Sequence, residues 1–280
     1  AIDAALEGDT VFVASGTYYE NVWINKESLT LIGEDTDNTI IDGIGMYNVI
    51  FVSADNVQIS RFTIRNSGKS LYYYPPLSGI LLYSSEGHII SDTVILNNLM
   101  GIGIFYSSHT TLRNNNMTNN SYNFGVYGTS LLHYVNDVDT SNTVNGKPIY
   151  YWINEHDKQI PTNAGYVAVI NSTDITAKDL CLSNNEQGVL FAYTINSTIM
   201  NVIASDNYYG IYLAYTTNST IMNVTASYNY NGIYPWRSNS NSMKSNNVIN
   251  NGLDGIGLYY SDNNTIARNT VTDNGIGINA

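Results

Sequence analysis

A glycine followed by a β-branched residue recurs along this chain at a nearly constant spacing. The dipeptides are Gly79-Ile80, Gly101-Ile102, Gly125-Val126, Gly188-Val189, Gly210-Ile211, Gly232-Ile233 and Gly255-Ile256. Their spacings are 22, 24, 63, 22, 22 and 23 residues, and 63 is close to three periods. Self-similarity at such a period is typical of a solenoid, in which each repeat packs mainly on its two neighbours.

Two consecutive repeats are nearly identical: residues 188–209 are GVLFAYTINSTIMNVIASDNYY and residues 210–231 are GIYLAYTTNSTIMNVTASYNYN. Apolar residues alternate with polar ones over short stretches, which predicts strands separated by turns. In the second repeat we expect inward side chains at Ile211, Leu213, Ile221, Val224 and Ala226. Three short strands per period predict an all-β fold, a single-stranded right-handed parallel β-helix with about 22 residues per coil.

Two rows of polar residues keep the same period. An asparagine stands 19 residues after the glycine, at Asn98, Asn120, Asn207, Asn229, Asn251 and Asn274. A hydroxyl row follows at Ser85, Ser107, Thr194, Thr216, Ser238 and Ser261. Stacked asparagines can pass amide hydrogen bonds from one coil to the next, so we expect this row to hold the coils together.

The domain organisation follows from the same repeat. We expect one β-helix domain over residues 1–280, with a short amphipathic helix at 1–6 within an N-terminal cap of residues 1–9. Residues 145–165 break the period and are predicted to be an irregular insertion. The chain starts and stops abruptly, which suggests a fragment of a longer surface protein.

The composition excludes several classes of protein. The net charge is −12, with 23 acidic and 11 basic residues, whereas nucleic-acid binding needs clustered bases. No apolar run approaches 18 residues, so no membrane span is expected. Only one cysteine is present, which excludes an intramolecular disulfide, and Cys181 between two leucines is predicted to be buried.

Several segments resemble known β-helix families. The opening AIDAALEGDTVFVASGTYYENVWINKESLTLIGE resembles the start of pectate-lyase-like domains, and NNTIARNTVTDNGIGI resembles repeats of carbohydrate-binding and sugar-hydrolase domains. Residues 145–154, NGKPIYYWIN, resemble NosD-type surface proteins of archaea. The resemblance implies an extracellular or cell-surface domain that acts on a polysaccharide or cell-surface glycan. NosD proteins are associated with copper-site maturation, but this chain has no Cys/Met/His cluster.

Candidate catalytic residues are few. Glycosidases use two carboxylates about 5–9.5 Å apart, which a β-helix can place on one strand or on adjacent coils. Asp137 and Asp139 are expected on one face of a strand, and Glu155 and Asp157 lie inside the expected insertion. We predict these four as catalytic candidates for a hydrolase or lyase. They can equally be turn residues and a solvated loop tip.

Candidate binding residues are basic and aromatic. Arg61 and Arg65 are expected on one strand, where they could bind an anionic sugar, or simply face solvent. Five residues after the glycine come Tyr106, Tyr193, Tyr215, Arg237 and Tyr260, Trp236 is adjacent, and Tyr212 and Tyr234 stand two after it. We expect many of these rings to face solvent and bind sugar. They could instead pack on one another, or form a protein interface.

Other ligands and functions stay open at this point. No cofactor or metal site is predicted, although Ca²⁺ could bind Asp/Asn turns. The four histidines lack ligand spacing, and His88 and His109 fall in nearly equivalent places on adjacent coils. The alternatives to a carbohydrate-active domain are a non-catalytic structural or adhesive module, able to form a homo-oligomer or surface lattice through its Tyr-rich faces, and a NosD-like accessory protein for copper-site maturation.

Overall fold

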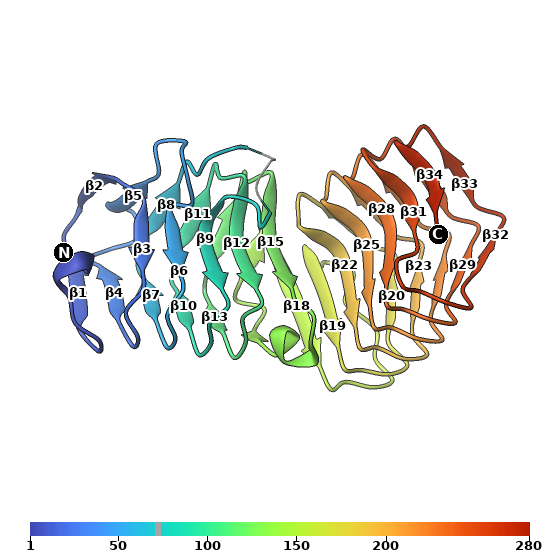
Figure 1. Ribbon diagram of the computed structural model, residues 1–280, viewed down its shortest axis with the longest axis horizontal. Helices are drawn as coiled ribbons and strands as arrows, with labels where there is room; N and C mark the ends of the chain where they lie inside the picture. The colour runs from blue at the N-terminus through green and yellow to red at the C-terminus, as the bar shows by residue number, and fades with distance from the viewer. Residues whose placement is uncertain (71–73) are drawn as a thin grey trace. The chain divides into compact units, whose positions relative to one another are not determined.

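A computed structural model describes residues 1–70 and 74–280, which fold almost entirely as short strands. The chain divides into two compact units, residues 1–146 (unit 1) and 147–280 (unit 2). Within each unit the strands of successive coils pair in parallel, as Figure 1 shows. Val189 pairs with Ile211, and Ile211 with Ile233, so the 22-residue period is the coil. The predicted right-handed parallel β-helix is confirmed.

Unit 1 contains three parallel sheets and two 3-10 helices. The first sheet is β1 (Thr10–Val13), β4 (Thr30–Gly33), β7 (Gln58–Ser60), β10 (Ile89–Ser91), β13 (Thr111–Arg113) and β16 (Asp137–Val138). The second is β2 (Gly16–Tyr19), β5 (Thr39–Asp42), β8 (Thr63–Arg65), β11 (Val94–Leu96), β14 (Asn116–Thr118) and β17 (Thr143–Val144). The third is β3 (Val22–Ile24), β6 (Ile50–Val52), β9 (Ser78–Tyr83), β12 (Met100–Phe105) and β15 (Tyr122–Tyr127), and the helices are η1 (Ile2–Ala4) and η2 (Leu131–Tyr134).

Unit 2 repeats this arrangement. Its first sheet is β20 (Thr176–Lys178), β23 (Thr198–Met200), β26 (Thr220–Met222), β29 (Ser242–Lys244) and β32 (Thr265–Ala267). The second is β21 (Cys181–Ser183), β24 (Ile203–Ser205), β27 (Thr225–Ser227), β30 (Asn247–Ile249) and β33 (Thr270–Thr272). The third holds β18 (Lys147–Ile153), β19 (Tyr166–Ile170), β22 (Gln187–Ala192), β25 (Tyr209–Ala214), β28 (Asn231–Trp236), β31 (Asp254–Gly257) and β34 (Ile276–Asn279). The five side chains expected to point inward are all in its core.

The N-terminal helix is shorter than predicted. Only Ile2–Ala4 form a 3-10 helix, no side chain within it is buried, and Ala5 is already extended. Six residues are too few for an α-helix to nucleate on its own, which explains the difference. The ring of Phe12 on β1 stays 61% exposed, so η1 covers only part of the first coil.

Two other local expectations need correction. Lys147–Ile153 form the regular strand β18, and only residues 154–165 of the expected insertion contain no strand. Cys181 is exposed rather than buried. It is the first residue of β21, and because side chains alternate along a strand, its neighbours Leu180 and Leu182 take the inward positions.

The predicted asparagine row is a continuous ladder of buried hydrogen bonds. In unit 2, Asn229 donates from Nδ2 to Asn251 Oδ1 (3.1 Å) and to the Ala204 carbonyl (3.0 Å), and its Oδ1 accepts from Asn207. Asn98 and Asn120 make the equivalent bonds in unit 1. The hydroxyl row is also confirmed, since the Ser238 hydroxyl accepts from the Thr216 N–H.

The repeated glycine is required because another backbone passes very close to it. A Cβ on Gly210 would lie 2.6 Å from the Gly232 carbonyl oxygen and 2.8 Å from Asn229 Nδ2. We therefore expect Gly210→Ala to destabilise unit 2 by about 2 kcal/mol, through forced backbone displacement. The measurement is the urea midpoint, with Gly252→Ala as control, since its Cβ would meet nothing closer than 3.7 Å. Equal losses in the two variants would contradict the close-approach explanation.

Candidate functional site

Five predicted binding residues come together at one turn of unit 2. Tyr193, Tyr215 and Arg237 directly follow β22, β25 and β28, Trp236 ends β28, and Tyr260 lies three residues beyond β31. Because successive coils stack, these turns lie next to one another. We call the set Tyr193, Tyr215, Trp236, Arg237 and Tyr260 the aromatic strip.

The side chains of the aromatic strip form a continuous line of contacts. The Tyr193 and Tyr215 rings stack with centroids 4.5 Å apart and planes at 19°. Tyr215 meets Trp236 edge to face at 5.0 Å. The guanidinium carbon of Arg237 lies 5.2 Å from the Trp236 ring centroid, 5.5 Å from that of Tyr260 and 5.9 Å from that of Tyr215. Arg237 is therefore held among three rings, in a geometry suited to cation–π attraction.

The backbone of the strip is in a costly conformation. Tyr193, Tyr215, Arg237 and Tyr260 all have φ between 50° and 55°. The left-handed region costs bulky residues about 1–2 kcal/mol, and Asn, Asp or Gly usually occupy it. The next turn column of unit 2 follows that rule, with Asn196, Asn218, Ser240 and Asn263. Large side chains at this one column call for a compensating gain.

Ring stacking accounts for part of that gain. A stacked aromatic pair is worth about 0.5–1.5 kcal/mol, enough to offset the conformational cost at Tyr193 and Tyr215. Arg237 is different, because its exposed guanidinium gains about 0.5–1 kcal/mol from each ring contact at most. It makes no ion pair with any residue of 1–70 or 74–280. A cation is thus fixed on the surface with its hydrogen-bond donors unused.

The tyrosines two residues after the glycine behave differently from the expectation. Tyr212 is only 1% exposed, and it stacks on the buried Tyr209 at 4.8 Å and 19°. The expectation that this ring faces solvent was wrong. In this row the alternative is correct: rings pack on one another and cover the sheet face. Tyr208 and Tyr230 likewise stack at 4.7 Å and 25°.

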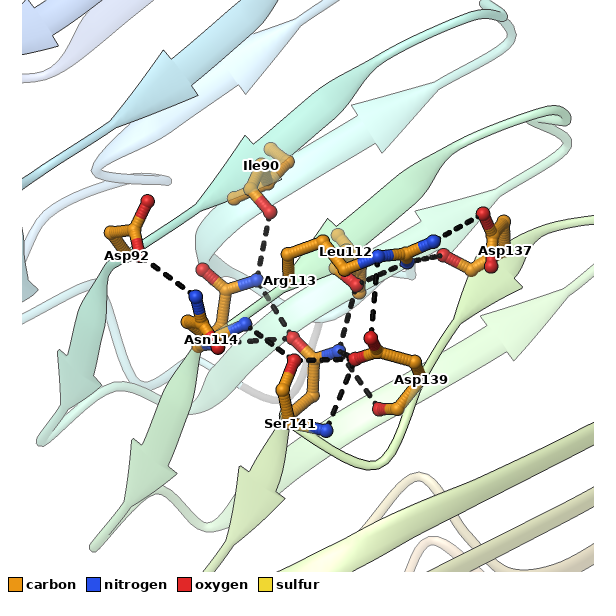
Figure 2. A network of polar contacts seen from close by, with 10 residues as sticks. Ile90, Asp92, Leu112, Arg113, Asn114, Asp137, Asp139 and Ser141 are labelled. Carbon is orange, nitrogen blue, oxygen red and sulfur yellow. Dashed lines mark hydrogen bonds and ion pairs between the residues drawn. The ribbon is translucent and has the colours of Figure 1, made fainter.

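The predicted catalytic pair of unit 1 is bonded to an arginine. Figure 2 shows Arg113 between Asp137 and Asp139, its Nη2 paired with Asp137 and its Nε 3.3 Å from Asp139 Oδ2. Arg113 Nη1 also donates to the carbonyls of Leu112 (2.7 Å) and Asp137 (2.9 Å). Both carboxylates therefore lie on the same side of the strand, as expected. The sequence prediction had not included their partner Arg113.

Asp139 also closes the turn that follows it. Its Oδ1 accepts hydrogen bonds from the Ser141 N–H (3.0 Å) and hydroxyl, and from Asn142 Nδ2 at 3.2 Å (Figure 2). A glycosidase acid must carry a proton at neutral pH, whereas these donors and the guanidinium favour the ionised carboxylate. The arrangement suits an ion-paired turn better than acid–base catalysis.

The second predicted pair is likewise ion-paired, but separately. Glu155 Oε2 lies 2.5 Å from Lys158 Nζ, while Asp157 Oδ2 lies 3.3 Å from His156 Nδ1. Lys158 also sits 5.8 Å from the centre of the Trp152 ring. Each carboxylate thus has its own partner in the loop after β18.

The two candidate arginines of unit 1 do not share a strand. Arg65 ends β8, whereas Arg61 lies in the turn before it with φ 66° and donates to the Glu34 carbonyl. Arg65 Nε is 2.8 Å from Asp42 Oδ2. Burial raises the pKa of Asp42, but hydrogen bonds from Arg65, the Ile44 N–H and Asn66 outweigh it and lower the pKa overall. Arg65 is therefore committed to a structural ion pair.

No metal-binding arrangement is found in the described part of the chain. Among residues 1–70 and 74–280, no group of three or more His, Cys, Asp or Glu side chains is placed to hold a metal ion. His88 and His109 do not stack. His88 is buried and stands in register with Thr110, while His109 is exposed. No helix in the same residues is long and apolar enough to cross a membrane.

The sequence matches one protein family along nearly its whole length. Residues 2–158 and residues 133–280 each match the family described as periplasmic copper-binding protein (NosD). The chain belongs to the NosD family. This confirms the resemblance at residues 145–154 and extends it across both units. No curated protein matches the sequence of this NosD family member.

Solved β-helix structures resemble this NosD family member only distantly. An alginate lyase from Paenibacillus sp. has 13% identity and a TM-score of 0.41, covering 100% of this chain and 95% of the other. A pectin methylesterase from Yersinia enterocolitica has 14% identity and a TM-score of 0.36, covering 100% and 92%. A mannuronan C-5 epimerase A-module from Azotobacter vinelandii has 15% identity and a TM-score of 0.38, covering 96% and 68%. These similarities assign no activity.

Proposed function

We propose that this NosD family member is an exported glycan-binding protein whose aromatic strip contacts the sugar chain. The observation that carries the proposal is Arg237, a cation held among three rings in a left-handed turn, with no ion pair in residues 1–70 or 74–280. A guanidinium presents five N–H donors in a fixed fork, which suits sugar hydroxyls and carboxylates. The family's periplasmic description supports export.

We propose binding rather than cleavage for this protein. Each of the four carboxylates predicted to be catalytic has a basic partner in its own turn or loop. A neighbouring cation favours the ionised form and removes the proton that a general acid would donate. The strip contributes aromatic rings and a guanidinium, and no carboxylate belongs to it.

The copper named in the family description does not fit the donors of this chain. Copper favours cysteine, methionine and histidine ligands. Cys181 is an exposed strand residue. Met200 and Met222 are neighbours in register, but Lys178 and Lys244 flank them in the same row, and their ammonium groups would repel a cation. We therefore derive no copper step.

The experiment is a glycan array probed with the purified protein, together with an assay for new reducing ends. The proposal predicts retention on at least one class of glycan and no new reducing ends. Retention on no glycan would overturn it. Self-association without glycan binding would favour the structural or adhesive module instead, which the stacked pairs Tyr193–Tyr215 and Tyr208–Tyr230 would also serve.

A further inference from the structure

Unit 1 carries a hollow of about 250 Å³ that lies apart from every residue considered so far as a binding or catalytic candidate. It is bordered by Asp55, by residues 84–86, by Tyr106 and Ser108, and by Leu132 and His133 of η2. The chain leaves the regular coil between β15 and β16, and η2 lies in this excursion. The excursion therefore forms a side wall beside the stacked turns.

One wall of the hollow is a pair of carboxylates on adjacent coils. Asp55 Oδ1 accepts the Glu86 N–H at 2.8 Å, which ties the two turns together. Glu86 Oε2 lies 3.4 Å from the Ser108 hydroxyl and 3.6 Å from His109 Nδ1. Asp55 Oδ2 and Glu86 Oε1 accept no hydrogen bond from residues 1–70 or 74–280. Each carboxylate keeps one acceptor oxygen for a ligand.

The opposite wall presents a donor. The Thr129 N–H donates to His133 Nδ1 at 3.1 Å, so in the neutral ring the proton is on Nε2. Burial lowers the pKa of His133, which favours that neutral ring. The site is built closely, since a Cβ on Gly128 would lie 2.2 Å from the His133 Cβ. The Tyr134 hydroxyl anchors the excursion by donating to the Gly128 carbonyl at 2.7 Å.

A row of aromatic rings leads to the hollow along the third sheet of unit 1. Trp23 contacts Phe51 at 6.4 Å, Phe51 contacts Tyr83 at 6.3 Å, and Tyr83 contacts Tyr106 at 5.8 Å between ring centroids. Tyr106 in turn meets His133 edge to face at 5.8 Å. The Trp23 ring is 58% exposed. Unit 1 thus has aromatic surface on several successive coils, ending at a polar hollow.

We propose that this hollow is a second sugar-binding site, which takes an uncharged pyranose ring of a glycan lying along the aromatic row. The free carboxylate oxygens would accept sugar hydroxyls, His133 Nε2 would donate to one, and Tyr106 and Leu132 give the ring an apolar surface. A uronate is excluded by charge. No Lys or Arg borders the hollow, and unit 1 holds 14 acidic residues against 5 basic ones.

The test is isothermal titration in EDTA-containing buffer with cellotetraose, mannotetraose, chitotetraose and tetragalacturonate. The protein carries Arg237→Asn throughout, so failure of the aromatic strip and failure of this site are distinguished. We expect at least one neutral tetrasaccharide to bind and tetragalacturonate not to bind. Glu86→Gln should weaken that binding at least tenfold, since it replaces a charged acceptor with a weaker neutral one.

A second variant tests the geometry and a third controls for charge. Gly128→Ala displaces His133 without changing any charge, and should also weaken binding at least tenfold. Asp37→Asn removes an exposed carboxylate elsewhere in unit 1 and should leave affinity within about twofold. Far-ultraviolet circular dichroism checks that each variant is folded. The proposal is overturned if no neutral sugar binds, if tetragalacturonate binds as well, or if folded Glu86→Gln binds like its parent.

Discussion

Replacing Asn229 with aspartate is expected to destabilise unit 2 by about 3–5 kcal/mol, although the two side chains have the same shape. Aspartate has no N–H donor. Its carboxylate would face the Ala204 carbonyl and Asn251 Oδ1, which now accept hydrogen bonds from Asn229 Nδ2 at 3.0 and 3.1 Å. Two favourable contacts become two repulsive ones in a site that is 2% exposed.

The measurement is urea unfolding followed by circular dichroism. Asn218→Asp is the matched control, because Asn218 lies in the same coil but is exposed, in a left-handed turn that aspartate tolerates. We expect the control to change the free energy of unfolding by less than about 0.5 kcal/mol. Equal effects at the two positions would mean that the buried ladder is not what holds neighbouring coils together.

Replacing Glu186 with glutamine is expected to stabilise unit 2, increasingly as the pH rises. Glu186 is fully buried between β21 and β22, and neither carboxylate oxygen has a hydrogen-bond partner in the described residues. Burial raises the pKa of this carboxyl from the usual 4.5 to about 8. The side chain is therefore protonated in the folded protein at neutral pH.

The direction of the pH effect follows from proton binding. Between pH 4.5 and about 8, the folded state holds a proton on Glu186 that the unfolded state has lost. Stability of the wild-type protein therefore falls as the pH rises through this window, and stays low above it. The loss is on the order of 4 kcal/mol from a shift of this size, and Glu186→Gln removes it.

Urea unfolding of wild type and Glu186→Gln at about pH 4 and about pH 9 measures this difference. We expect nearly equal stability at the lower pH and a large advantage for the variant at the higher one. Asp262→Asn removes one exposed carboxylate from the same unit and controls for net charge. A stability difference that does not grow with pH would show that Glu186 is not a buried, protonated acid.

The coil was predictable because its determinants are local and repeated. Gly210 allows the Gly232 backbone to approach, and Asn229 joins neighbouring coils, and both recur with the period. The irregular places were less predictable. Asn145 and Gly146 both have positive φ, 49° and 76°, as in a two-residue type I′ turn. That Asn-Gly signal was interpreted as the start of an insertion, so the regular strand β18 after it was missed.

The candidate site was predictable only where the period holds. Tyr193, Tyr215 and Arg237 come together because exactly one coil of 22 residues separates consecutive members. The partner of Asp137 could not be found in this way. Thr111 pairs with Asp137 across 26 residues, because the excursion containing η2 lengthens that coil. The lengthened coil also brings His133 to the hollow, and no spacing in the sequence indicates either placement.

The most direct test of the proposed function compares two arginines. Arg237 and Arg268 are both exposed, both lie in left-handed turns of unit 2, and neither makes an ion pair with residues 1–70 or 74–280. Only Arg237 lies on the aromatic strip. Titration of the array-selected glycan should show affinity at least about tenfold weaker for Arg237→Asn and changed by less than about twofold for Arg268→Asn. Equal losses would reduce the effect to general charge, and unchanged binding in both would contradict the aromatic strip as the glycan-binding surface.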